Sequence, residues 1–432
     1  MTAASSALPV ESEFSESYEV PLIRPFAGLR PAPQHAAEVA APPYDVLTAA
    51  EARARAADKP WSFLHISRPE IDLPEGTDPY ASSVYAKAAE NLQRMLGKGV
   101  LMRDDKPCFY VWRMVMGDLE QTGLVAAASV AEYDGNRIRK HEFTRPDKED
   151  DRVRQIEALN AQTGPVLLAY PDAPGIDALL AQSAEGEAVA NITADTGVRH
   201  TLWRVDEPDT QRRLAEAFEA LSALYIADGH HRSAAASRVA AARRGSNGRQ
   251  TGNESYNYFL AVAFPHHQMH ILPYNRVVLD LNGMDRAQLL KRLQERFWVE
   301  QSIAPIAPAQ PAMFGLYIEG SWYKLAVRPE YLSADDPVAR LDVSLLADNV
   351  LAPLFGITDL RRDARIDFVG GIRGLEELEA RVDGGSAACA FSLFATRMED
   401  LMAVADAGKV MPPKSTWFEP KLADGMVSHV LD

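Results

Sequence analysis

Hydrophobic and polar residues follow alternating strand-like and helix-like patterns through the first half of the chain. Short apolar runs bounded by turn residues predict strands at 108–115, 122–131, 137–144 and 165–170. The first two form an antiparallel pair that turns at Gly117-Asp118. Helical spacing predicts helices at 51–58, 81–96 and 147–160.

The second half contains the clearest strand-to-helix pattern of the sequence. Leu214, Phe218 and Leu221 form one helical stripe, the apolar run 223–227 predicts a strand, and Gly229 separates that strand from an alanine-rich helix. The remaining elements continue the alternation. They are the helix 233–244, the strands 256–264 and 269–278, the helix 286–296, a hairpin over 313–327 turning at Gly320-Ser321, the helix 343–354, the strand 389–394 and the helix 397–407.

This alternation predicts an α/β protein with mixed (α+β) sheets, an additional antiparallel sheet and a C-terminal α/β region. We expect residues 1–20 to be a disordered acidic leader, because glutamates and serines outnumber apolar residues there. Residues 21–172 are expected to form an N-terminal α/β domain, and 173–300 a phosphate-binding domain. Residues 301–432 then form the C-terminal region, whose tail closes over the substrate.

Composition restricts the classes of function. The chain has 432 residues and a net charge of −15, which argues against a nucleic-acid binder, since such proteins carry a basic surface. We find no signal-peptide pattern at the N-terminus and no apolar run long enough to span a membrane. Cys108 and Cys389 lie in apolar runs and are predicted to be buried free thiols, so we expect a cytoplasmic protein.

The turn from Asp228 to Arg232 (Asp-Gly-His-His-Arg) is the strongest candidate site. The first N–H groups of a helix have no intrahelical partner and lie at the positive end of its dipole, so a strand–glycine–helix turn can bind an anion. His230 and His231 add donors, and Arg232 can grip phosphate oxygens in a fork. The alternative is a capped turn with Asp228 as cap and surface histidines. The crowding of two histidines and an arginine favours phosphate binding by all five residues, including Gly229.

A second cluster spans 140–152. On an extended strand Lys140, Glu142 and Thr144 share one face, and a carboxylate between a lysine and a hydroxyl suits a general base or a substrate contact. The acidic run that follows, with Asp147 and Asp151, is more typical of a solvated helix start.

A third cluster lies in the tail, in the proline-stiffened segment 411–421. Lys414, Ser415, Thr416 and Lys421 are candidates for binding an anionic substrate. The alternative is a strap that only docks Trp417 and Phe418 onto the body of the protein.

Two weaker features have a structural explanation beside a functional one. The Pro-Pro-Tyr-Asp loop at 42–45 could bring Tyr44 and Asp45 to a pocket, or form a simple turn. His266, His267 and His270 suggest a metal, but a strand would point His267 away from the other two. We therefore assign no protein metal site. The P-loop, dinucleotide-fold and nucleophile-elbow motifs do not occur in the sequence.

The 228–232 turn resembles the phosphate-binding box of the ParB/sulfiredoxin-like superfamily, which implies a core of that fold. Most of the chain from about Arg24 to Val427 resembles DUF1015, a bacterial family of unknown function. The segments that carry this second resemblance are 24–30, 41–46, 140–144, 228–232, 272–276 and 411–416.

Within the superfamily, the histidine-containing box is most similar to that of free-serine kinases. The resemblance implies a phosphotransferase that uses ATP or ADP with Mg²⁺ and acts on a small hydroxy amino acid, serine by preference. Glu142 would be the base, and His230 and His231 would assist catalysis. Two alternatives remain. One is a phosphoserine phosphatase with the same site, and the other is a non-catalytic nucleotide sensor. The sequence leaves the oligomeric state open.

Overall fold

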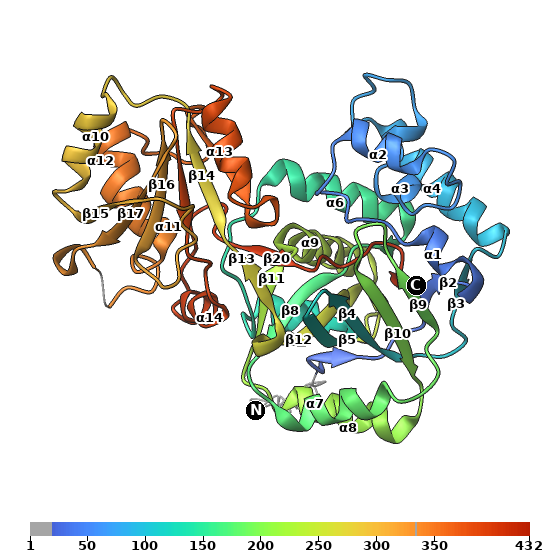
Figure 1. The fold of residues 1–432 in the computed structure, drawn as a ribbon. Helices are drawn as coiled ribbons and strands as arrows, with labels where there is room; N and C mark the ends of the chain where they lie inside the picture. The colour runs from blue at the N-terminus through green and yellow to red at the C-terminus, as the bar shows by residue number, and fades with distance from the viewer. Residues whose placement is uncertain (1–19, 333–334) are drawn as a thin grey trace, which may run out of the picture.

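The computed structural model describes residues 20–332 and 335–432, and the expected leader 1–20 lies outside this part except for Val20. The described chain forms two lobes (Figure 1). The larger lobe holds a nine-stranded mixed sheet with helices around it, and the smaller lobe holds a six-stranded antiparallel sheet. The predicted class, α/β with mixed sheets, is confirmed.

The nine-stranded sheet has the order β6-β11-β8-β12-β5-β4-β10-β9, with β1 paired to β5 outside this path. Only β6–β11 and β8–β12 are parallel pairs. The predicted antiparallel pair around Gly117-Asp118 is confirmed as β4 and β5. The strands are β1 Ile23–Arg24, β4 Phe109–Met116, β5 Leu119–Ser129, β6 Ile138–Arg139, β8 Val166–Tyr170, β9 Ala190–Thr193, β10 Arg199–Val205, β11 Leu224–Asp228 and β12 Tyr258–Pro265.

Successive side chains on each strand point to opposite faces of this sheet, and both faces carry buried apolar residues. On β4, Phe109 and Val111 join the core beneath the helices, whereas Tyr110 and Trp112 join the opposite core. The helices of the first face are α5 Val130–Asp134, α7 Pro174–Ser183, α8 Pro208–Glu219 and α9 His230–Ser246. The C-terminal segment 411–427 contributes apolar side chains to the second core, so the tail packs against the sheet.

A four-stranded sheet, in the order β3-β2-β21-β7, joins both ends of the chain to the large lobe. Its strands are β2 Gly28–Pro31, β3 Leu101–Arg103, β7 Ala161–Gln162 and β21 Ser428–Val430, and the neighbouring helices are α1 Ala36–Val39, α2 Ala49–Ala56, α3 Leu64–Ser67, α4 Ser82–Gly97 and α6 Pro146–Leu159.

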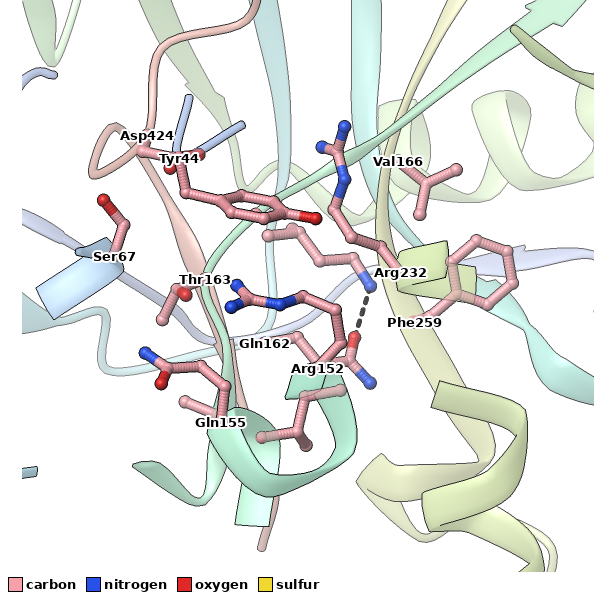
Figure 2. A pocket seen from close by; sticks show the side chains of 14 residues that line it. Tyr44, Ser67, Arg152, Gln155, Gln162, Thr163, Val166, Arg232, Phe259 and Asp424 are labelled. Carbon is pink, nitrogen blue, oxygen red and sulfur yellow. Dashed lines mark hydrogen bonds between the residues drawn. The ribbon is translucent and has the colours of Figure 1, made fainter. Parts of the chain in front are cut away.

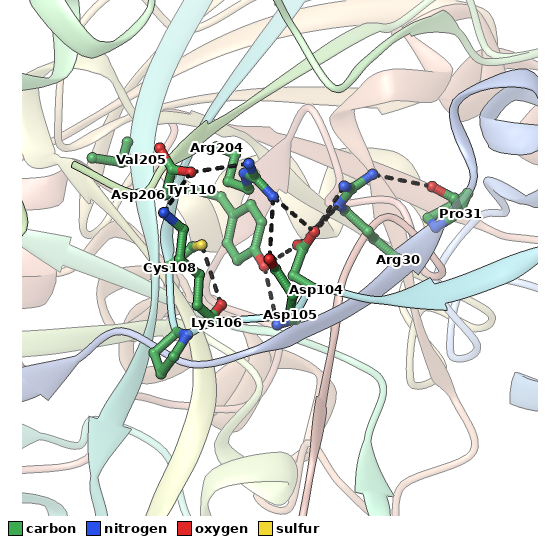
Figure 3. Close-up of polar contacts among 12 residues, drawn as sticks. Arg30, Pro31, Asp104, Asp105, Lys106, Cys108, Tyr110, Arg204, Val205 and Asp206 are labelled. Atoms are coloured by element: carbon green, nitrogen blue, oxygen red, sulfur yellow. Dashed lines mark hydrogen bonds and ion pairs between the residues drawn. The ribbon is translucent and has the colours of Figure 1, made fainter. Parts of the chain in front are cut away.

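A buried ionic network ties this small sheet to the large one (Figure 3). Arg30 on β2 forms a two-pronged pair with Asp104, with N–O distances of 2.8 and 2.9 Å. The carboxylate also accepts the Tyr110 hydroxyl at 2.6 Å and lies 3.4 Å from Arg204. Gly28 is needed for this approach, since a Cβ there would lie 2.4 Å from the Tyr110 oxygen.

The small lobe has the sheet order β15-β17-β16-β19-β14-β18, and the two-stranded pair β13–β20 links it to the tail. The strands of its sheet are β14 Tyr274–Val278, β15 Phe297–Ser302, β16 Met313–Ile318, β17 Ser321–Val327, β18 Ile366–Gly370 and β19 Cys389–Leu393, and the linking pair consists of β13 His270–Leu272 and β20 Trp417–Glu419. Its helices are α10 Arg286–Leu293, α11 Asp342–Leu346, α12 Ala352–Phe355, α13 Glu376–Asp383 and α14 Met398–Asp406.

The expected boundaries at 172 and 300 do not separate the sheets. Strands on both sides of residue 172 belong to the nine-stranded sheet, because β8 pairs with β11 and β12. The small lobe already begins at β14, well before residue 300. We therefore propose a division near residue 273, with the tail from 411 returning to the large lobe.

Three local predictions differ from the structure. The strand predicted at 137–144 ends at Arg139, and residues 140–145 form a loop. The strand predicted at 269–278 is interrupted at Pro273, which has no N–H for a ladder hydrogen bond. The hairpin turns at Glu319-Gly320, one residue earlier than predicted, because both residues have positive φ, 46° and 72°.

Both cysteines are buried and unpaired, as predicted, and burial raises the pKa of Cys108 to about 11. Within residues 20–332 and 335–432, each helix is too short or too polar to cross a membrane.

Candidate functional site

A cleft of about 1160 Å³ lies between the two lobes and the tail. Among its described lining residues, nine Lys and Arg side chains face five Asp and Glu side chains, although the whole chain carries a net charge of −15. The basic residues are Arg68, Arg145, Lys148, Arg152, Arg232, Arg361, Arg362, Lys414 and Lys421. The acidic residues are Asp45, Glu70, Glu142, Asp151 and Asp228. The cleft is therefore a local basic site that suits an anionic ligand.

The start of α9 opens into this cleft, directly after β11. Gly229 has φ +99° and ψ 25°, a left-handed conformation that favours glycine, and no side chain caps the helix. The Gly229 carbonyl accepts the N–H groups of Arg232 and Ser233. The earlier N–H groups of the first turn thus lie at the positive end of the dipole, as an anion site requires.

Arg232 lies against Gly229. A Cβ on Gly229 would come within 3.0 Å of Arg232 Nε and 3.1 Å of Cζ. One Nη donates to the Pro165 carbonyl, and the other lies 3.7 Å from Asp228 Oδ2. The protein thus already engages part of the guanidinium group. Fewer of its N–H groups are free for the two-pronged phosphate contact that the sequence predicts.

Asp228 lies between two cations, Arg232 and Lys421, whose Nζ is 3.6 Å away. Burial alone would raise the pKa of this carboxyl group, but Lys421, Arg232, His230 and the Gly229 N–H together lower it to about 2. Asp228 therefore stays ionised, which makes it a poor general base and a suitable oxygen ligand for a hard cation.

The two histidines of the turn hold the neighbouring loop in place. His230 Nε2 accepts the N–H of His141 at 3.4 Å, and His231 Nε2 accepts the N–H of Arg145 at 3.1 Å. Both bonds require an unprotonated Nε2, and burial lowers the pKa of both rings accordingly. The sequence predicted catalytic and phosphate-binding roles for these residues. The geometry adds a positioning role for the loop that carries Glu142.

Glu142 projects from this loop into the cleft, with Oε2 3.7 Å from His230 Nδ1 and the side chain half exposed. Partial burial and the nearby Asp228 carboxylate raise its pKa, while Lys414 and Arg361 act in the opposite direction. A raised pKa brings a carboxylate closer to the range in which it can take a proton from a hydroxyl group.

The structure does not support the shared strand face of Lys140, Glu142 and Thr144, because the strand ends before Lys140. Lys140 points away from the cleft, donates to the Tyr133 carbonyl at 3.0 Å and lies over the Tyr133 ring. Thr144 lines the cleft, but its hydroxyl already donates to Glu149.

The tail residues predicted from the sequence all line the cleft, but they differ in exposure and in hydrogen bonding. Lys414 is exposed, with a positive φ of 58°, and its carbonyl accepts the buried Arg276 side chain at 3.0 Å. Ser415 is buried and its hydroxyl donates to Pro412, so this residue shapes the turn. Thr416 and Lys421 line the cleft. The Met411 N–H donates to the His141 carbonyl, which joins the tail to the Glu142 loop.

Behind Arg232 lies a small cavity of about 30 Å³, enough for about one water molecule (Figure 2). Arg152 stacks under the Tyr44 ring, with its Cζ 3.9 Å from the ring centroid. Asp424 is buried there, and desolvation raises its pKa to about 7 although Arg232 and Arg152 oppose the shift. Asp45 lines the cleft beside Tyr44, so the loop predicted at 42–45 does reach a pocket.

Two groups of side chains have metal-binding geometry in the described chain. The ligand atoms of His141, Glu142 and His230 lie within 4.8 Å of one another, but the His230 tautomer fixed by its Nε2 bond puts a proton on Nδ1. A cation there would rely on Glu142 and on His141 Nδ1, which has no partner among residues 20–332 and 335–432. The second group, Asp172, His266 and His267, lies outside the cleft and does not include His270.

Sequence reasoning missed several cleft residues. Arg361 and Arg362 come from the loop before β18, and Arg68 follows α3, without a motif that marks them. Asp424 is also marked by no motif in the sequence. Only three-dimensional packing brings these side chains to the 228–232 turn.

The family model described as "Protein of unknown function (DUF1015)" matches residues 23–344. The chain belongs to this family. This agrees with the resemblance of its sequence segments to DUF1015, and the family description names no activity. No curated protein matches this DUF1015 protein.

Solved structures resemble the DUF1015 chain loosely. A conserved hypothetical protein from Pyrococcus furiosus has 15% identity and a TM-score of 0.33, over 67% of this chain and 90% of that one. A free serine kinase in complex with AMP has 15% identity and a TM-score of 0.32, over 66% and 84%. SbnI with a C-terminal truncation, from Staphylococcus aureus, has 11% identity and a TM-score of 0.37, over 69% and 85%. Such likeness transfers no residue roles.

Proposed function

We propose that this protein is a phosphotransferase that moves a phosphoryl group from a nucleotide, ATP or ADP, to the hydroxyl group of a small hydroxy amino acid. The observation that carries the proposal is the basic cleft of an acidic protein, built around the uncapped start of α9 with a carboxylate of raised pKa beside it. Phosphoryl transfer needs mainly positioning and charge neutralisation, and this cleft contains groups for both.

In this proposal the nucleotide phosphates lie on the first turn of α9. Lys421 and Lys414 line the same cleft and would neutralise the charge that develops during transfer. Mg²⁺ would arrive with the nucleotide, and the Asp228 carboxylate, whose pKa is lowered to about 2, would offer it an oxygen ligand. The cleft volume of about 1160 Å³ leaves room for a nucleotide and a second small molecule.

Glu142 is the proposed base. Its pKa is raised whereas that of Asp228 is lowered to about 2, so of these two neighbouring carboxylates Glu142 is the better proton acceptor. His230 and His231 keep its loop against α9. Serine as the acceptor comes from the resemblance of the 228–232 turn to the box of free-serine kinases. The same residues would serve hydrolysis of phosphoserine if water took the place of the acceptor.

The test is an assay of both directions by phosphorus NMR. The purified protein is incubated with Mg²⁺ and either ATP or ADP plus serine, and separately with phosphoserine. We expect phosphoserine to form in the first mixture. Glu142→Gln should lower turnover by roughly 10²–10⁴ with little change in nucleotide affinity. Glu185→Gln, an exposed carboxylate outside the cleft, is the matched control and should behave as wild type.

Three results would change the proposal. Phosphate release from phosphoserine without transfer would make the protein a phosphatase. Tight nucleotide binding with no turnover in any mixture would contradict an enzyme and favour the nucleotide sensor. Wild-type turnover of Glu142→Gln would leave the enzyme and remove this base.

A further inference from the structure

The small lobe contains a second pocket of about 390 Å³, which shares no lining residue with the cleft. It lies between α11, the end of β19 and the start of α14, with Pro311 and Ala312 on one side. The described lining combines an apolar wall with a small number of charged side chains. Leu341, Leu345 and Phe394 belong to the apolar wall.

Like Asp400, Asp342 lines this pocket and is only 8% exposed. Its Oδ1 accepts the N–H of Ala312 at 2.9 Å. Its Oδ2 is buried and has no hydrogen-bond partner among the described residues, although the Phe394 N–H lies close enough to the carboxylate to lower its pKa. Ala312 has a positive φ of 62°, unusual for a residue with a side chain, at the point where its N–H meets Asp342. Buried carboxylate oxygens are normally paired, so Oδ2 is a natural position for a ligand's N–H group.

The outer part of the pocket carries two arginines and one carboxylate. Arg397 holds Asp400 by a two-pronged contact, at 2.8 and 3.0 Å, and Arg340 lies 3.4 Å from the same carboxylate. Both guanidinium groups are partly exposed, 53% and 40% by side chain, while Asp400 is buried. Two arginines thus share the one carboxylate that they contact at the rim, and Asp342 is more buried than either arginine.

We propose that this pocket binds a free α-amino acid as a zwitterion. The ammonium group would donate to Asp342 Oδ2, the carboxylate would face Arg340 and Arg397, and the side chain would lie on the apolar wall. The pocket has four ionisable side chains, two arginines and two aspartates, so their formal charges sum to zero. The arginines provide positive charge and Asp342 provides negative charge, which match the two opposite charges of a zwitterion. The proposal of this binding site does not depend on the reaction proposed for the cleft.

The position of the pocket connects its occupancy to the cleft. Thr396, in the pocket lining, donates its hydroxyl hydrogen to the Ser415 carbonyl at 2.9 Å. Ser415 belongs to the tail that lines the cleft. A ligand that orders the segment from Phe394 to Arg397 would therefore also restrict the motion of the tail through this hydrogen bond. Binding of an amino acid in the pocket could in this way change the affinity of the cleft for its ligands.

The pH response follows from the surroundings of Asp342. Burial, with the nearby Asp400, raises the pKa of Asp342 to about 7, and the N–H groups of Ala312 and Phe394 and the charge of Arg397 oppose the shift. An ammonium group binds the ionised carboxylate, so we expect the affinity for the amino acid to rise as the pH increases from 6 to 8.

The test is calorimetric titration of the full-length protein with L-alanine, L-serine, L-leucine and L-phenylalanine. Ethylamine and propionate, which each lack one charge of alanine, are the matched probes. We expect at least one amino acid to bind and both single-charge probes to bind at least tenfold more weakly. Asp342→Asn and Arg397→Gln should each weaken binding tenfold or more, and Glu185→Gln, at an exposed carboxylate outside both the pocket and the cleft, should leave it unchanged.

Arg397 is half exposed, so its variant probes the site even if Asp342→Asn fails to fold. Absence of binding by all four amino acids would overturn the proposal. Binding that survives both pocket variants but is lost in Glu142→Gln would assign the amino acid to the cleft and also overturn it. Binding of ethylamine as tight as that of alanine would contradict the role of the arginines.

Discussion

Gly229→Ala tests whether the turn before α9 must be glycine for anion binding. Gly229 has φ +99°, and an added Cβ would lie 3.0–3.3 Å from three atoms of the Arg232 guanidinium. The substitution therefore causes backbone strain and also displaces Arg232. Two other glycines separate these effects. Gly197 has φ +83° with open space around it, whereas Gly164 has an ordinary φ and a Cβ there would lie 3.2 Å from Arg232 Cδ.

The expected magnitudes follow from this geometry. A left-handed alanine costs about 1–2 kcal/mol, partly offset by about 0.4–1 kcal/mol from the stiffer unfolded chain. Displacement of Arg232 removes a charge-assisted contact worth about 1.5–3 kcal/mol, or roughly 10- to 100-fold in affinity. Gly229→Ala should lose stability and affinity, Gly197→Ala stability alone, and Gly164→Ala mainly affinity.

Urea denaturation gives the free energy of unfolding of each variant, and calorimetric titration with ATP and Mg²⁺ gives the affinity. Because Gly197→Ala shares the strain of Gly229→Ala, the difference between the two in affinity isolates the effect on Arg232. Wild-type affinity of Gly229→Ala would refute the phosphate role of this turn. An equal loss of affinity in Gly197→Ala would show that general destabilisation, and not the turn, weakens binding.

Further predictions concern the buried polar groups. Asp104→Asn should cost about 3–5 kcal/mol in urea denaturation because it leaves Arg30 buried without its partner, and the exposed Asp105→Asn should cost under about 0.5 kcal/mol. Burial lowers the pKa of His200 to about 4, so between pH 6.5 and 4 the unfolded chain binds a proton there that the folded chain does not. Stability should fall as pH decreases through this range, and less steeply in His200→Gln; equal slopes would contradict the assignment. His231→Leu should speed hydrogen exchange of the amides from 142 to 145, since it removes the acceptor of the Arg145 N–H.

The sequence was most informative where neighbours in the chain decide the structure. Gly229 between an apolar run and an alanine-rich helix was enough to predict the turn, and Gly117-Asp118 was enough for the β4–β5 pair. The strand predicted at 137–144 was wrong beyond Arg139, because the histidines of α9 hold those residues as a loop through long-range bonds. The strand predicted at 269–278 was wrong at Pro273, because proline has no N–H for a ladder hydrogen bond.

The candidate site was only partly predictable, for the same physical reason. Glu142, the 228–232 turn and the tail were recognisable as polar clusters, but their common cleft depends on packing between two lobes and the returning chain end. Arg361 reaches the cleft from a loop of the small lobe, and Asp424 reaches Arg232 through the tail. The boundary predicted at 172 does not coincide with an edge of the nine-stranded sheet, because β8 pairs with strands that follow it by more than fifty residues.

The most direct measurement of the central claim is a crystal structure of the protein with ADP and Mg²⁺. The account predicts that a phosphate oxygen accepts hydrogen bonds from the N–H groups of the first turn of α9, with Mg²⁺ near Asp228 and Lys421 within reach of the phosphates. A nucleotide bound elsewhere, or phosphates beyond hydrogen-bond distance of His230 and His231 N–H, would contradict it.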